Sequence, residues 1–217
     1  PSSSDFKIVS IDFSSMFAFC SSLSNINGID TWNVYNVTNF NHFFSNCTSL
    51  CDIRALEKWD IINCKSFSYM FYGCKKLSDI KPLEKWNPLS CNSFSNMFFE
   101  CGLSDISPLE NWNVSNCSDF SCMFYECNSL SNIKGLEKWN VSNCYNFSCM
   151  FYNCKSLSTI ESLEKWKVSK CSDFSYMFSF CSSLSDINPL KQWNVSNCRN
   201  FSGMFSGCES LSDIKNR

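Results

Sequence analysis

Apolar side chains recur in this chain in one fixed order, separated by polar residues, about every 27 positions. Counted from a tryptophan as position 1, most units carry Cys at 6, Phe at 9, Met at 12, Phe at 13, Cys at 16, Leu at 19 and Ile at 22. The steps of three, one and three residues between positions 9 and 16 are helical, because residues three and four apart share one helix face. This pattern predicts a short helix in every unit, for example over residues 147–154.

A Leu-x-x-Ile segment follows each predicted helix, as in residues 157–160. We predict a short parallel strand in this segment. It ends within a few residues, because Pro82, Pro108 and Pro189 cannot donate a ladder hydrogen bond. The sequence leaves open whether the next segment, Trp-Asn-Val, forms a second strand.

A fixed period of this length is typical of a solenoid, in which each unit buries its core against its neighbours. We predict one α/β solenoid of about eight 27-residue turns over residues 1–217, each turn with one short parallel strand and one short helix. One step is 26 residues long, where Cys101-Gly102-Leu103 lacks a residue. The regular turns begin at Trp32, Trp59, Trp86, Trp112, Trp139, Trp166 and Trp193.

The two ends of the chain differ from the regular turns. The first turn, 1–31, is degenerate, since Asp5 stands where the tryptophan belongs and Ser10 where the cysteine belongs, whereas turns over 32–217 are regular. Terminal turns diverge in this way because they face water. The chain opens without Met and ends partway through a unit, so we expect it to be a piece of a longer array.

The run Met-Phe-x-x-Cys-x-x-Leu, with a tryptophan about ten residues later, resembles the BspA-like leucine-rich repeat surface proteins of bacteria and parasitic protists. The resemblance implies a right-handed leucine-rich-repeat-like superhelix and a role in adhesion to host or neighbouring cells. It also favours a cell-surface or secreted location, with a cytoplasmic one as the alternative. The run recurs as Met123-Phe124-Cys127-Leu130, Met150-Phe151-Cys154-Leu157 and Met177-Phe178-Cys181-Leu184.

The charge balance of 18 basic and 20 acidic residues gives a net charge of −2, without any basic run. Phosphate binding needs a basic surface, so we expect no nucleic-acid partner. No stretch approaches the roughly 20 apolar residues of a membrane span, so we expect no direct membrane insertion of this segment.

Most of the 17 cysteines fall into two columns, a column being the residues at one position in successive turns. Both columns lie on apolar positions, where a thiol behaves as a small hydrophobe, so we expect them to be buried and reduced; several disulfides are the alternative. Cys122 and Cys149 lie outside these columns at one position of adjacent turns. Stacked turns bring Cα atoms to about 5 Å, within the range of a disulfide, so this pair is the best disulfide candidate.

Catalytic and metal chemistry find little support. The one histidine, His42, cannot be combined with a nucleophile into a catalytic set, so we expect no enzyme and no cofactor. We expect no metal site, because the paired Cys-x-x-Cys spacing is absent and the cysteine stripe is buried. An acidic column at position 21 could bind cations, or its oxygens could accept backbone amides; it contains Asp52, Asp79, Asp105, Asp186 and Asp213.

Four aromatic residues occupy position 14 on successive turns: Tyr72, Phe99, Tyr125 and Tyr152. On a helix this position lies about 140° from the Phe of position 9, so the rings would face outward. We interpret them as a candidate surface for a protein or a surface glycan, within a non-enzymatic binding or adhesion module. The alternative is that the rings only seal the outer wall, in a structural spacer or intracellular scaffold without a specific ligand.

Overall fold

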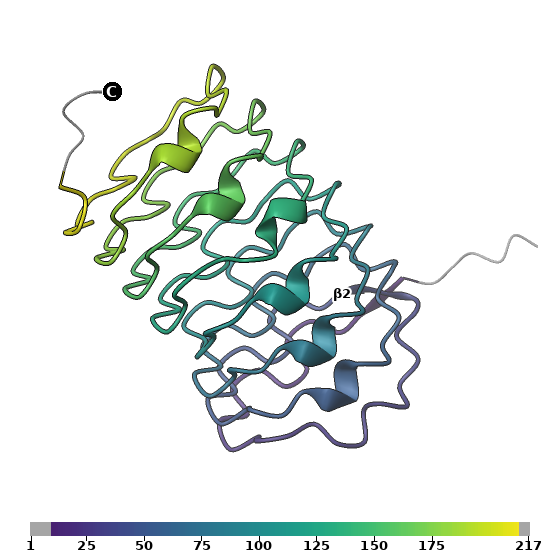
Figure 1. Ribbon diagram of the computed structural model, residues 1–217. Coiled ribbons are helices and arrows are strands. Elements are labelled where there is room, and N and C mark those ends of the chain that lie inside the picture. Colours follow the sequence, from purple (N-terminus) through teal and green to yellow (C-terminus); the bar gives the residue numbers. More distant parts are fainter. Residues whose placement is uncertain (1–9, 213–217) are drawn as a thin grey trace, which may run out of the picture.

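The computed structural model describes residues 10–212, which wind into coils that stack side by side in an elongated body (Figure 1). Each coil is one repeat, and equivalent residues of successive repeats lie next to each other, as the backbone hydrogen bonds between them show. The chain is therefore a repeat solenoid. The predicted features at Asp5 and Asp213 lie outside the described residues.

Regular secondary structure is sparse in this part of the chain. Two strands, β1 (Ile11–Asp12) and β2 (Val37–Asn39), pair in parallel. Short 3-10 helices line up along one face of the solenoid (Figure 1). These are η1 (Arg54–Leu56), η2 (Lys81–Leu83), η3 (Ser107–Leu109), η4 (Leu136–Lys138), η5 (Glu161–Leu163) and η6 (Asn188–Leu190).

The helix predicted at positions 9 to 16 does not form. In residues 147–154, alternate amides bond across to the next coil: Phe147 N–H donates to the Asp173 carbonyl at 3.0 Å, and Phe151 N–H to the Met177 carbonyl at 2.9 Å. Between them, the Met150 amide bonds back to the Phe147 carbonyl at 3.2 Å, which closes a four-residue turn.

Two such turns per coil explain why the sequence pattern looked helical. The first and fourth residues of each turn point inward, which gives the same spacing of three, one and three. The third residue of each turn has positive φ, 55° at Cys149 and 56° at Asn153. A helix would satisfy its amides internally, whereas these turns leave half of them for the neighbouring coil.

The strand predicted in the Leu-x-x-Ile segment is also wrong, apart from one bridge between Asn25 and Asp52. In the described residues, parallel pairing runs instead along position 8, where isolated bridges join each coil to the next from Asn39 to Asn200. The prolines do not end a strand; Pro82 lies in the first turn of η2, where its missing N–H costs nothing.

The acidic column at position 21 has a structural role. The Asp79 Oδ1 atom accepts the Lys81 amide at 2.9 Å, and the Asp105 Oδ1 atom accepts the Ser107 amide at 2.8 Å. Each carboxylate thus satisfies a free N–H at the start of a 3-10 helix.

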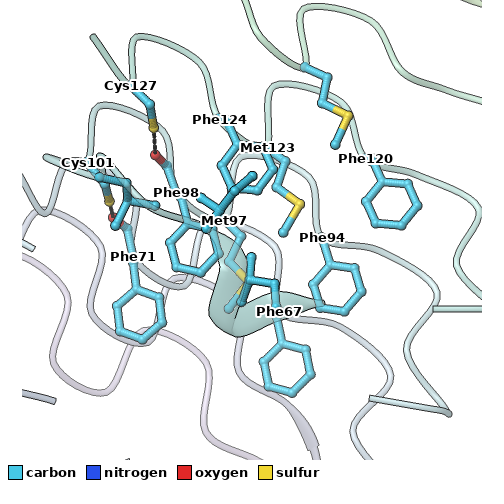
Figure 2. Close-up of a cluster of buried hydrophobic side chains, with 14 of the residues drawn as sticks. Phe67, Phe71, Phe94, Met97, Phe98, Cys101, Phe120, Met123, Phe124 and Cys127 are labelled. Atoms are coloured by element: carbon cyan, nitrogen blue, oxygen red, sulfur yellow. Dashed lines mark hydrogen bonds between the residues drawn. The ribbon is translucent and has the colours of Figure 1, made fainter. Parts of the chain in front are cut away.

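The core consists of columns of stacked side chains, shown in Figure 2. The rings of Phe94 and Phe120 at position 9 lie 5.7 Å apart, and those of Phe98 and Phe124 at position 13 lie 5.8 Å apart. Both pairs are fully buried. Flat stacking of one ring type in each column fixes the register of the coils, since a shift of one residue would set polar side chains inside.

The prediction that the two cysteine columns are buried is confirmed, except at Cys20, which is exposed, and Cys198, which is half-buried. Figure 2 shows why a thiol suits position 16: Cys127 Sγ donates to the Phe98 carbonyl of the preceding coil at 3.2 Å. Tryptophan acts similarly, since Trp139 Nε1 donates to the Leu109 carbonyl at 2.9 Å. Each coil is therefore joined to its neighbour by side-chain as well as backbone donors.

Candidate functional site

The four aromatic residues of position 14 form a continuous stack on the outer wall. Ring centroids are 4.4 Å apart between Tyr72 and Phe99, 4.2 Å between Phe99 and Tyr125, and 4.4 Å between Tyr125 and Tyr152. The interplanar angles are 20°, 7° and 7°. All four rings are half-buried, and the two inner ones, Phe99 and Tyr125, have a neighbouring ring stacked on each face.

Three further rings extend the stack, and the sequence interpretation missed them. Tyr69 packs against Tyr72 at 5.6 Å, His42 stacks on Tyr69 at 4.4 Å, and Phe180 and Tyr152 form a T-shaped pair at 5.5 Å. These residues occupy positions 11 and 15. Positions 11 and 15 would face outward on a helix too, as position 14 does, so the aromatic residues at these positions were the signal that the sequence interpretation overlooked.

The stacked rings are partly shielded from water and lie close to the acidic side chains of Glu100 and Glu126. Burial raises the pKa of the Tyr72 hydroxyl, and the nearby Glu100 carboxylate adds to the shift. Burial likewise raises the pKa of Tyr125, followed by the effects of Tyr152 and Glu126. The hydroxyl groups of Tyr72 and Tyr125 therefore stay neutral and can donate hydrogen bonds to a partner across the physiological pH range.

Catalytic machinery is not evident in the described residues. His42 has its pKa lowered by burial and stacks on a tyrosine rather than facing a nucleophile. Two open hollows of about 450 and 550 Å³ lie between the 3-10 helices, and both are lined by Glu110 and other charged side chains without a histidine. Within residues 10–212, no cluster of three or more His, Cys, Asp or Glu side chains could hold a metal ion.

The thiols of Cys122 and Cys149 are half-buried neighbours on adjacent coils. The hydrogen bond between the two thiols raises the pKa of Cys122 and lowers that of Cys149. Both residues have φ of 55°, so their Cα–Cβ bonds leave the wall in the same direction. Their pairing as a disulfide stays a prediction.

Solved structures with a similar arrangement are leucine-rich repeat proteins. The T. pallidum leucine-rich repeat protein is 18% identical, with a TM-score of 0.41, over 99% of this chain and 77% of its own. Internalin C2 of Listeria monocytogenes is 13% identical, with a TM-score of 0.36, over 85% and 78%. A leucine-rich repeat protein of Bacteroides ovatus is 14% identical, with a TM-score of 0.34, over 92% and 68%.

No curated protein matches the chain. In the part of the chain that the structure describes, no helix has the length and apolar character needed to cross a bilayer. A family model matches residues 11–134 and again residues 129–216, which together span nearly the whole sequence. The chain therefore belongs to the family described as "Mycoplasma protein of unknown function, DUF285".

Proposed function

We propose that this chain is a non-enzymatic protein-binding module, and that the aromatic stack is its binding surface. One observation carries the proposal: the rings occupy position 14 on four successive coils, while Ser45, Ser179 and Ser206 hold the same position elsewhere in the array. The coils fold with serine there, so the fold does not require the rings. Tyrosine edges combine apolar area with a hydroxyl donor at low conformational cost, which suits recognition.

A protein partner suits this surface better than a glycan. A sugar or a cation that binds an aromatic ring uses its flat face. Here the centroid separations of 4.2 to 4.4 Å leave no room between rings, so only the edges and hydroxyl groups are accessible. Ring edges fit the side-chain mixture of a protein surface.

We place the module at a cell surface or in the secreted fraction, as a BspA-like adhesion protein. The support is the Met-Phe-x-x-Cys-x-x-Leu resemblance to that family of surface proteins. The competing function is a spacer or intracellular scaffold, in which the rings only seal the wall.

The double variant Tyr125→Ser, Tyr152→Ser separates these functions. We expect beads coated with the variant to lose most of their adhesion to cultured cells, because two of the four exposed edges are gone. Stacked pairs contribute about 0.5–1.5 kcal/mol each, so adhesion is compared per folded molecule, well below the unfolding transition. Tyr145→Ser is the control, since Tyr145 is 51% exposed and makes no ring contact within the described residues. Unchanged adhesion of the double variant, with lower stability, would favour the spacer.

A further inference from the structure

The repeat that begins at Trp86 is one residue shorter than the other regular repeats, and it lacks the turn that follows position 16 in the two flanking coils. In the flanking coils, Leu77 N–H donates to the Cys74 carbonyl at 2.9 Å, and Leu130 N–H to the Cys127 carbonyl at 3.1 Å. Gly102 replaces the two residues that make this turn. A Cβ atom on Gly102 would lie 2.8 Å from the Lys75 carbonyl oxygen, so the shortened chain presses against the preceding coil.

This shortened corner leaves a cavity of about 250 Å³ on the outer surface. Two acidic residues, Glu100 and Glu126, line it together with Lys75. Lys75 Nζ pairs with Glu100 at 3.1 Å. Glu126 makes no ion pair with any described residue, so one carboxylate in the cavity lacks a compensating charge.

The cavity adjoins the middle of the aromatic stack. Glu100 directly follows Phe99, and Glu126 directly follows Tyr125. Their carboxylates are close enough to act on the hydroxyl groups of Tyr72 and Tyr125. A partner lying across the ring edges would therefore pass over the opening.

We propose that this cavity receives an arginine side chain of the protein partner, whose neighbouring apolar residues lie on the ring edges. The proposal rests on the function proposed above and names the chemistry of its partner. A guanidinium group is planar and carries five donors, so it can bond Glu126 while sharing Glu100 with Lys75. Asn128 and Ser129, which also line the cavity, offer further side-chain oxygens.

The test uses the peptide Ac-Leu-Arg-Leu-NH2 and a matched peptide in which neutral citrulline replaces arginine. Each is titrated into the isotope-labelled chain, and backbone amide shifts are followed by NMR. We expect saturable shifts at Gly102, Glu126 and Ser129 with the arginine peptide. Binding should be at least about fivefold weaker with citrulline, and weaker in about 0.5 M NaCl. Equal binding of the two peptides, or shifts confined to other coils, would overturn the proposal.

Two variants identify the cavity as the site. Glu126→Gln removes the uncompensated charge and should weaken the arginine peptide about fivefold or more. Replacement of Gly102 by Asn-Ser, the pair that follows Cys127, restores the 27-residue spacing and should abolish the shifts with both carboxylates still present. If both variants bound the arginine peptide as tightly as the parent chain, the cavity would not be its binding site. If the insertion disturbs folding, Glu126→Gln alone decides.

The bead assay distinguishes this proposal from the proposed function. Adhesion lost in Tyr125→Ser, Tyr152→Ser and retained in Glu126→Gln would keep the aromatic binding surface and reject the arginine cavity. Loss of adhesion in the double tyrosine variant and in Glu126→Gln would support the aromatic binding surface and the arginine cavity together. Adhesion retained in both variants would reject the aromatic binding surface and the arginine cavity.

Discussion

Buried thiols are tolerated throughout this core because each one donates a weak hydrogen bond while occupying little volume. At position 6, Cys144 Sγ lies 3.3 Å from the carbonyl oxygen of Asn146 and 3.4 Å from that of Ser118 in the preceding coil. Val37, which takes the same position in another coil, fills the space without the donor. Cysteine is therefore a packing residue here, and a reagent needs local opening to reach it.

The buried cysteines should make the protein less stable as the pH becomes alkaline. Burial raises the pKa of Cys117 and of Cys171 from 9.0 to about 12. Because the folded pKa is the higher one, their contribution to stability is complete below about pH 9 and is lost as the pH rises toward 12. We expect the urea midpoint to fall between about pH 8 and about pH 10.5, and to fall less in Cys117→Val, Cys171→Val. An identical fall in both proteins would contradict this assignment.

A separate prediction concerns the half-buried thiols of Cys122 and Cys149. In material prepared under oxidising conditions, a non-reducing peptide map should contain the Cys122 to Cys149 link, since the thiols are in hydrogen-bond contact. Cys51, which is exposed but outside the pair, serves as the control and should stay free to alkylate. Full alkylation of both Cys122 and Cys149 in this material would contradict the predicted disulfide.

At the scale of elements, the wall is built from pairs of turns that need a left-handed residue at positions 11 and 15. Position 15 contains Gly73 and Gly207, for which positive φ carries no steric cost. Other coils place Asn, Glu or Phe there, and the cross-coil hydrogen bonds hold these residues in that conformation. The Asn153 amide, for example, donates to the Ser179 carbonyl at 2.7 Å.

Substitutions at Asn153 distinguish these turns from a helix. With φ at 56°, Asn153→Val should lower the free energy of unfolding by about 1–2 kcal/mol, because a β-branched residue resists this region. Asn153→Gly should change it by less than about 0.5 kcal/mol. In a helix the order would reverse, since glycine is the poorer helix former. Urea unfolding of the two variants and the parent makes the measurement.

At the scale of the whole molecule, stability comes from interfaces between neighbouring coils rather than from one central core. The same aromatic, thiol and indole contacts recur at each interface, so the stability of such an array is close to a sum over units and their interfaces. The register of every column is kept by the repeat length.

Removal of one whole repeat should therefore be tolerated. Deletion of residues 139–165 joins Lys138 to Trp166 with all columns in register. The shortened chain should unfold cooperatively, with a somewhat lower midpoint. Deletion of residues 139–151 alone puts the columns out of register and should prevent cooperative unfolding, as followed by circular dichroism and tryptophan fluorescence. If the two shortened chains unfolded with similar cooperativity, stability would not depend on keeping the columns in register.

The periodicity alone determined the solenoid, the unit length and nearly all of the buried residues, because a column of apolar side chains can be buried only if successive units stack. It also identified the aromatic residues of position 14 as dispensable for the core. What it could not determine was the backbone between them. Spacings of three, one and three fit a helix and a pair of turns equally well at Phe147, Met150 and Phe151.

Only the tertiary structure decided between helix and turns, since the deciding partner of each amide lies in the next coil, 25 or 26 residues away. That choice set the ring contacts through which His42, Tyr69 and Phe180 extend the aromatic stack. It also turned a one-residue deletion at Gly102 into a charged cavity. The spacing of apolar residues along the chain predicts which side chains are buried. The backbone conformation that buries them depends on hydrogen bonds between neighbouring coils, which are far apart in the sequence.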